Sequence, residues 1–392
     1  MDQNLRTIDW NVTTMDSYLR TVDLYVTTMD RSFVPTIGRT LSWDLYIFSK
    51  YHDQLSLEYR MQLALRIIQY FYYPILAIVG VPVNLLAIGI LSREKCGLSK
   101  CVTRYLVAMS AADLLTIILD LILRHIPIVY KKQFQFLMFS VRTCNIHAVL
   151  LYAATDCSVW FTVTFTFDRF VAICCQKLKS KYCSEKTAAV VLGTVTVLSG
   201  LKNIFWYFML KDRYWLYNEP WFCAIAGDVR SSLIWGTIEF LHNILTPGVA
   251  FVLILLLNAV TVRYILVSSR SRRRLRAHSS GESRRDPEMK SRRKSIILLL
   301  AISANFMLLW AVFMVYSIWW RMWWFGYRSA ILPKFLRELG FMLQLLSCCT
   351  NTVIYAVTQT QFRQQLKIAL KYPFQLNHCL FPAAAKRCLP LW

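Results

Sequence analysis

Ionisable side chains are rare inside the long apolar stretches of this chain, so each one marks a position where chemistry is expected. Asp113 lies midway along one stretch, and the sequence Asp168-Arg169-Phe170 ends another. A charge in an apolar environment is costly unless it is paired, so such residues are by default candidates for ion binding or switching. Ser158 precedes Arg169 by 11 residues. In a helix, both side chains would point the same way, about 16 Å apart.

The composition identifies the environment that must hold these residues. Of 392 residues, 56% are hydrophobic and 17% are charged, whereas soluble domains are roughly 25% charged. A soluble enzyme is therefore not expected. The formal net charge of +23 could suit nucleic acid or anionic lipid. Because the charges crowd between apolar runs, we expect a membrane protein that contacts lipid and binds no nucleic acid.

Seven apolar runs are each long enough to cross a bilayer as a helix, which takes about 20 residues. They lie near residues 68–91, 104–126, 143–174, 187–210, 232–267, 295–320 and 335–357. The expected fold is therefore all-α, with a seven-transmembrane helix bundle over 67–357. A flexible N-terminal tail over 1–66 should precede the bundle.

Lysine and arginine residues set the expected orientation, because basic loops stay on the cytoplasmic side. They gather in the first, third and fifth connections between spans, most densely between Ser268 and Ser295. These connections should be cytoplasmic, which places the N-terminus outside and the C-terminus inside a multi-pass plasma-membrane protein. Asn11 begins a glycosylation sequon, Asn11-Val12-Thr13, which is useful only if this end is extracellular.

Cysteine positions agree with this topology. Ten of the 12 cysteines fall in spans or cytoplasmic segments, where thiols stay reduced. Cys144, at the outer start of the third span, and Cys223, in the loop before the fifth, are the two that remain. We expect a disulfide between them; the alternative is two unrelated thiols. Cys379 and Cys388 near the C-terminus are candidate palmitoylation sites.

Several motifs follow one another in the order found in a known family of membrane proteins. They are Asn84, Asp113, Cys144 with Cys223, Asp168-Arg169-Phe170, Pro247, Phe306 with Trp310, and Asn351 to Tyr355. With them, the chain resembles a rhodopsin-like (class A) G-protein-coupled receptor from about residue 68 to 371. The resemblance implies a receptor and not an enzyme. It also implies a short amphipathic eighth helix over 358–372, containing Phe362, and a cytoplasmic tail over 373–392.

The resemblance gives these residues expected roles. Asp113, with Ser158 and Asn351, would bind Na⁺ in the resting state; the alternative is a protonated, hydrogen-bonded Asp113. No cofactor would be required. Asp168 would hold Arg169 until the sixth span swings outward. The site for a heterotrimeric G protein would then consist of Asp168, Arg169, Phe170 and Tyr355.

The resemblance also implies an activation switch and further partners. The switch would consist of Phe306, Trp310 and Pro247. Arrestin and receptor kinases are further expected partners.

The chain also departs from the family pattern. Ala311 follows Trp310 where a proline is usual, and Thr352 replaces the proline of the seventh-span motif. Leu151 occupies the third-span position at which amine receptors carry an aspartate, which disfavours a monoamine ligand. No lysine lies between Phe335 and Leu366, so no retinal Schiff base can form there. The chain most resembles the orphan branch whose members respond to aromatic amino acids.

Ionisable and aromatic residues in the outer half of the bundle indicate the chemistry of such a ligand. The carboxylate of an aromatic amino acid would pair with a cationic side chain of the protein, its amine with carboxylate side chains, and its ring with aromatic side chains. The candidate ligand-binding residues are Arg124, Asp156, Glu239, His242 and Phe313.

Structural alternatives compete with each part of this ligand site. Asp120 and Arg124, four residues apart, could neutralise one another. Asp156, Glu239 and His242 could form a closed polar network that holds helices together. A peptide bound at the outer rim is the alternative ligand. A seven-span transporter is disfavoured because no internal repeat relates the spans.

Overall fold

The computed structural model describes residues 41–51, 53, 55–94, 96–214, 222–226, 233–277, 287–324 and 332–380. The chain divides into two compact units, Met1–Tyr51 and His52–Trp392. In the first unit, the described segment forms helix α2 (Leu41–Tyr51). The second unit contains the seven spans, and the features discussed below belong to it.

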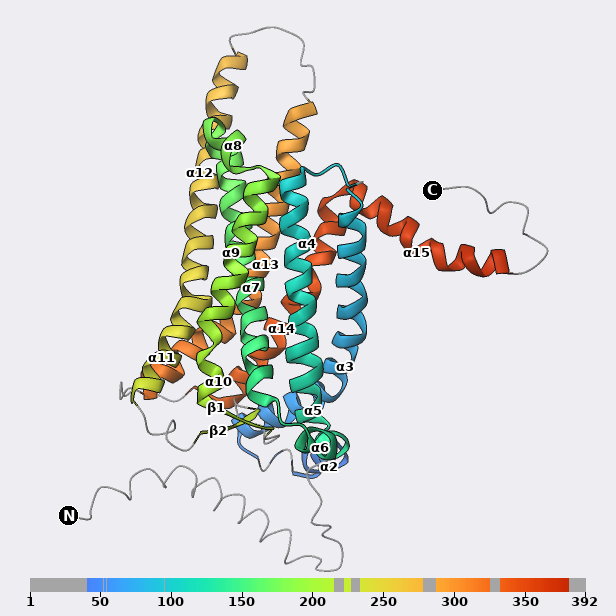
Figure 1. Cartoon of the computed structure of the whole chain (residues 1–392), viewed down its shortest axis with the longest axis vertical. Helices are drawn as coiled ribbons and strands as arrows, with labels where there is room; N and C mark the ends of the chain where they lie inside the picture. The colour runs from blue at the N-terminus through green and yellow to red at the C-terminus, as the bar shows by residue number, and fades with distance from the viewer. Residues whose placement is uncertain are drawn as a thin grey trace, which may run out of the picture. The chain divides into compact units, whose positions relative to one another are not determined.

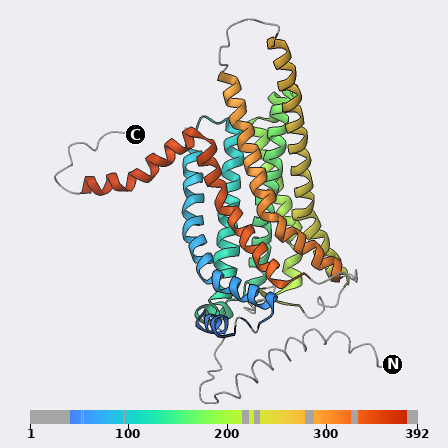
Figure 2. The same cartoon turned by 180° about the vertical axis from the view of Figure 1, so that it is seen from behind.

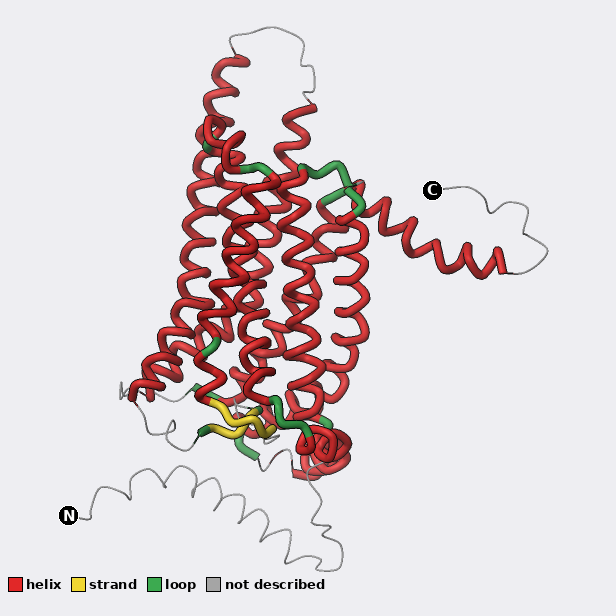
Figure 3. The backbone as a smooth tube through the Cα atoms, viewed as in Figure 1, coloured by secondary structure: helices red, strands yellow, loops and turns green. Residues whose placement is uncertain are grey.

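Seven helical spans run side by side in the second unit (Figure 1), and nearly all of its described backbone is helical (Figure 3). In chain order they are α3 (Leu57–Ser92); α4 (Lys100–Thr116) continued by η2 (Ile117–His125) and α5 (Ile126–Val129); α7 (Cys144–Cys174); α9 (Glu185–Asn203) with α10 (Phe205–Met209); α11 (Leu233–Asn243), η3 (Ile244–Val249) and α12 (Ala250–Ala277); α13 (Pro287–Trp324); and α14 (Lys334–Thr358). Each span is long and apolar enough to cross a bilayer, which confirms the expected all-α membrane fold.

Shorter elements join the spans. Helix α6 (Lys131–Ser140) lies between the second and third spans, and α8 (Gln176–Tyr182) between the third and fourth. Strands β1 (Leu210–Tyr214) and β2 (Cys223–Ile225) form an antiparallel pair, in which Tyr214 is opposite Cys223. This hairpin lies at the end of the bundle opposite α8 (Figure 1). No pattern in the sequence predicted this hairpin.

Two helix boundaries differ from the expected ones. Span one begins at Leu57 rather than at residue 67, and α2 also lies within the segment expected to be a flexible tail. The eighth helix, α15 (Thr360–Leu380), continues past residue 372. The residues around position 60 are polar, so the apolar run does not include the start of span one. A helix that projects beyond the apolar layer of the bilayer can contain such residues.

Serine side chains mark the starts of three spans. The hydroxyls of Ser56, Ser99 and Ser184 accept hydrogen bonds from backbone N–H groups in the first turns of α3, α4 and α9. Each hydroxyl satisfies an N–H group that a helix start leaves without a partner. The fifth span is interrupted instead: Thr246 has non-helical backbone angles (φ −136°, ψ 112°) just before Pro247, whose nitrogen cannot donate.

The interior of the bundle is filled by aromatic and aliphatic side chains. Tyr355 of α14 and Phe362 of α15 are fully buried, with their rings edge to face at 6.0 Å, so the eighth helix is fastened to the seventh span. On the outside, large apolar side chains such as Ile78, Val190 and Leu308 are exposed. Such a surface suits a helix bundle surrounded by lipid.

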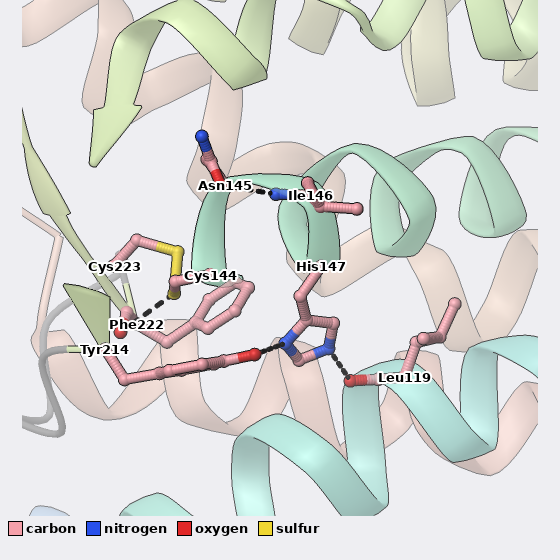
Figure 4. Close-up of a disulfide and its surroundings, with 8 residues drawn as sticks. All are labelled: Leu119, Cys144, Asn145, Ile146, His147, Tyr214, Phe222 and Cys223. Carbon is pink, nitrogen blue, oxygen red and sulfur yellow. Dashed lines mark hydrogen bonds between the residues drawn. A yellow bond between two sulfur atoms is a disulfide. The ribbon is translucent and has the colours of Figure 1, made fainter. Parts of the chain in front are cut away.

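A disulfide and a histidine attach the hairpin to the bundle (Figure 4). Cys144 and Cys223 are bonded, as the sequence predicted. His147 Nε2 lies 2.8 Å from the Leu119 carbonyl oxygen, and Nδ1 lies 3.2 Å from the Tyr214 hydroxyl. The carbonyl can only accept, so Nε2 carries the hydrogen. Burial raises the pKa of the Tyr214 phenol, which stays protonated and donates to Nδ1.

A glycine permits a close approach between the sixth and seventh spans, which lie side by side in Figure 2. A Cβ atom placed on Gly340 of α14 would lie 2.9 Å from Cα and 3.1 Å from the backbone nitrogen of Phe313 in α13. Backbone atoms inside a helix cannot move aside cheaply. The two helices can therefore pack at this distance only because residue 340 has no side chain.

The Gly340→Ala variant should be less stable than the wild type by about 1–3 kcal/mol, because it pushes α13 away from α14. The measurement is the melting temperature of the purified protein. Gly193→Ala is the matched control, since a Cβ atom at Gly193 meets nothing within 4 Å. Equal melting temperatures for Gly340→Ala and Gly193→Ala would contradict the packing argument.

Candidate functional site

Asp113 connects three spans in the middle of the bundle. Its carboxylate is almost completely buried, with 1% of the residue exposed. Ser158 Oγ of α7 donates to one carboxylate oxygen at 2.6 Å, and Asn351 Nδ2 of α14 donates to the other at 2.8 Å. The three residues expected to form an ion site therefore lie together, contributed by the second, third and seventh spans.

Asn84 makes a second polar link beside the seventh span. Its side-chain amide donates to the Gly80 carbonyl of its own helix and to the Cys348 carbonyl of α14, both at 2.9 Å. Asn84 is fully buried. The amide thus ties α3 to α14 at a point three residues before Asn351.

The oxygen atoms of Asp113 and several others in the chain belong to groups of the kind that can bind a cation. Within the described part of the chain, no basic side chain pairs with Asp113, and the carboxylate is surrounded by neutral groups. Ser110 Oγ and Asn84 Oδ1 are also buried oxygens without a hydrogen-bond partner among the described residues. Oxygen donors of this kind favour hard cations. The described residues hold no cluster of three His, Cys, Asp or Glu side chains that would suit a transition metal.

Arg169 lies at the opposite end of α7 from the disulfide and is bound on two sides. Its guanidinium donates to the Asp168 carboxylate, through Nε at 2.9 Å and through a second nitrogen, and to Ser295 Oγ of α13 at 3.4 Å. Cys101 Sγ donates to the other Asp168 oxygen at 3.2 Å. Burial, with the nearby Asp168 carboxylate, raises the pKa of the Cys183 thiol to about 11, so it stays protonated and donates to the Asp168 carbonyl.

The other two residues expected to contact a G protein differ in exposure. Tyr355 is fully buried against Phe362, whereas Phe170 is half-buried and lies beside Phe167, with ring centroids 6.4 Å apart. In this arrangement Tyr355 belongs to the core. Only Phe170 offers part of its side chain to the surface.

Aromatic rings form a continuous series through the sixth and seventh spans. Phe306 contacts Trp310 at 5.4 Å, Trp310 contacts Phe313 at 6.0 Å, and Phe313 contacts Phe341 of α14 at 5.3 Å between centroids. Trp310 Nε1 donates to Ser347 Oγ at 3.0 Å. Sequence reasoning named the first three rings but missed Phe341. Its place one residue after Gly340, where the two helices approach closely, was the available signal.

Arg124 lies at the end of this series nearest the disulfide. Its guanidinium pairs with Asp120 at 3.0 Å, as the structural alternative for these two residues anticipated. The same group lies over the Phe341 ring at 5.0 Å and over Phe222, next to the disulfide, at 5.4 Å. Arg124 therefore connects the second span, the hairpin and the seventh span.

Asp156 is directed mainly toward the fourth span. Its carboxylate pairs with Lys202 Nζ at 2.7 Å and accepts from Asn203 Nδ2 at 2.6 Å, both on α9. Lys202 in turn donates to Thr246 of the fifth span at 2.9 Å. Sequence reasoning missed Lys202, although a lysine inside an apolar span is itself a signal.

His242 and Glu239 are buried on the fifth span. The imidazole of His242 lies edge to face with Tyr152 and Phe205, each at 5.6 Å, and with Trp206 at 5.5 Å. These rings come from the third and fourth spans. The described contacts of His242 are thus aromatic, whereas Asp156 takes its hydrogen bonds from α9.

Three predicted modification sites lie beyond what the structure describes. Asn11 and Cys388 fall outside the described residues. Cys379 belongs to α15, but its side chain is outside the description.

Comparison with known proteins agrees with the geometry. Residues 83–355 match the family model described as "7 transmembrane receptor (rhodopsin family)". The chain is also similar to a mouse (Mus musculus) protein named "Probable G-protein coupled receptor 142", with 24% identity over 316 residues that cover 77% of this chain and 72% of that protein. The chain is therefore a multi-pass membrane receptor rather than an enzyme, and it belongs to the rhodopsin family of seven-transmembrane receptors.

Proposed function

We propose that this receptor senses an extracellular small molecule and activates heterotrimeric G proteins by promoting nucleotide exchange. The observation that supports this proposal most directly is the arrangement of Arg169. This residue is buried between Asp168 and Ser295 at the end of the bundle opposite the disulfide. Because basic connections tend to stay in the cytoplasm, we assign this end to the cytoplasmic side and the N-terminus to the outside. Arrestin and receptor kinases would act on the same face.

The mechanism depends on breaking one interhelical contact. Ser295 lies at the start of the sixth span, so an outward movement of α13 removes its hydrogen bond to Arg169. Arg169 can then leave Asp168 and line an opening for the C-terminal helix of a Gα subunit. Tyr355, now packed on Phe362, would turn inward beside Arg169.

Na⁺ would stabilise the resting receptor at Asp113. Asp113, Ser158 and Asn351 would hold the ion, and the buried oxygens of Ser110 and Asn84 are candidates for water-mediated support. The ion supplies a positive charge to a carboxylate that has no basic partner among the described residues. Charge compensation lowers the cost of keeping an ionised carboxylate in the bundle.

The proposed ligand is an aromatic amino acid bound in the outer half of the bundle. Arg124 would bind the ligand carboxylate, and the rings of Phe341, Phe313 and Trp310 would contact its aromatic side chain. A guanidinium carries five N–H donors, so Arg124 can bind a ligand carboxylate while it stays paired with Asp120. We assign the ligand amine to the carboxylate of Glu239, which is buried on the fifth span.

Membranes containing the receptor should accelerate GTPγS loading of purified G proteins when agonist is added. The Arg169→Ala variant should lose most of this acceleration at equal surface expression, because it removes the group that is released toward Gα. Arg104→Ala is the matched control, since Arg104 forms an exposed ion pair with Glu185 that should contribute little. If Arg169→Ala and Arg104→Ala load nucleotide equally, the coupling mechanism is wrong.

The ligand assignment predicts that phenylalanine or tryptophan activates the receptor and that the corresponding amide is weaker. Loss of a hydrogen-bonded charge pair with Arg124 should lower potency by about 10-fold to 100-fold. In the double variant Arg124→Gln with Asp120→Asn, which removes both charges of this ion pair, acid and amide should have similar potencies. The measurement is a dose–response curve for each ligand at matched surface expression. A wild-type preference for the acid that persists in the double variant would exclude Arg124 as the carboxylate partner.

A further inference from the structure

A buried ionic cluster joins the third, fourth and fifth spans apart from the signalling motifs. We call it the Asp156 cluster; it consists of Asp156 and Trp160 of α7, Lys202 and Asn203 of α9, and Thr246 of η3. Only 2% of Asp156 is exposed. Its carboxylate accepts from Lys202 at 2.7 Å and from Asn203 at 2.6 Å. A carboxylate bonded in this way satisfies most of its hydrogen-bonding capacity inside the protein.

The cluster reaches the fifth span at its one non-helical residue. Thr246 Oγ1 accepts from Lys202 Nζ at 2.9 Å and from Trp160 Nε1 at 3.0 Å. These two bonds use both lone pairs of the hydroxyl oxygen. Thr246 is buried, has extended backbone angles and precedes Pro247. The break in the fifth span is therefore held by donors from two other spans.

The break lies next to the core that the activation switch occupies. Ala250 and Ile254, in the first two turns of α12, pack with Phe306 and Trp310 of α13 and with Val159 of α7. Val159 precedes Trp160 directly. If repacking of Phe306 and Trp310 displaces α12 relative to α7, the bonds to Thr246 oppose that displacement.

We propose that the Asp156 cluster is a clamp that holds the break at Thr246 against the third and fourth spans and so favours the resting receptor. The clamp occurs together with a closed cytoplasmic end, where Arg169 is bound to Asp168 and Ser295. Lys202 acts as a positioning residue: its ammonium group compensates the charge of Asp156 and donates a hydrogen bond to Thr246. Weakening the hydrogen bonds to Thr246 lowers the free energy required to leave the resting arrangement.

The Thr246→Val variant tests the clamp, because valine keeps the β-branched shape and leaves the pair of Asp156 and Lys202 in place. Two readouts are taken without ligand. The first is intramolecular FRET between a fluorescent protein in the connection between the fifth and sixth spans and another at the C-terminus. The second is GTPγS loading of G protein. Loss of hydrogen bonds that involve a charged donor should raise the active fraction by roughly fivefold to tenfold.

Thr237→Val is the matched control, since Thr237 lies in the same span and its hydroxyl donates to the Leu233 carbonyl of its own helix. This control should behave as the wild type. If Thr246→Val does not reach the surface, Trp160→Phe replaces it, because this change removes one donor to Thr246 and keeps the ion pair; a smaller shift in the same direction is then expected.

The two readouts separate the clamp from the proposed coupling, on which only the second readout depends. A shifted FRET ratio in Thr246→Val but not in Thr237→Val supports the clamp. A shifted FRET ratio with unchanged GTPγS loading also supports the clamp, but it counts against the proposed G-protein coupling. A FRET ratio in the surface-expressed Thr246→Val or Trp160→Phe receptor that equals the Thr237→Val ratio would overturn the clamp.

Discussion

The carboxylate of Asp113 is the group on which the arrangement of the bundle depends most. Because it is buried among apolar helices, its oxygens must be satisfied by neighbouring spans, and Ser158 and Asn351 do so from α7 and α14. The same constraint recurs at each level of the bundle. Asp120 pairs with Arg124, Asp156 with Lys202, and Asp168 with Arg169. Asp113 differs because no basic side chain within the described residues neutralises it, which is why we propose a mobile cation there.

Contacts on α14 link the aromatic rings nearest the disulfide to Asp113. The series of rings from Phe341 through Phe313 ends at Trp310, whose indole donates to Ser347. Ser347 precedes Asn351 by one helical turn, and Asn351 binds Asp113. A ligand that moves the rings therefore acts on a helix that also carries one of the two hydrogen bonds to the buried carboxylate. Packed contacts of this kind can couple the two sites physically. The coupling is allosteric when the ligand and the ion both shift the same equilibrium between two states.

The sequence predicted features that depend on composition and on the order of residues along the chain. Spans appear as apolar runs, Cys144 and Cys223 were the two cysteines left outside, and the motifs around Asp113 and Arg169 have recognisable spacing. Hydropathy does not reveal which way a helix is rotated, so the pairing of Asp156 with Lys202 of the fourth span was missed. The ring of Phe341 and the hairpin at Tyr214 depend on contacts between distant segments. The start of α3 at Leu57 lies beyond the apolar run and is marked instead by the cap at Ser56.

The sodium dependence of thermal unfolding tests the central claim, that Asp113 is an ionised carboxylate whose charge is compensated by a bound cation. Purified wild-type and Asp113→Asn receptors would be melted in NaCl and in choline chloride at equal ionic strength. An ion that binds only the folded protein raises its stability in proportion to RT ln(1 + [L]/Kd). The account predicts a higher melting temperature in NaCl for the wild type and no difference between the salts for Asp113→Asn. An equal sodium effect in both proteins, or none in either, would contradict it.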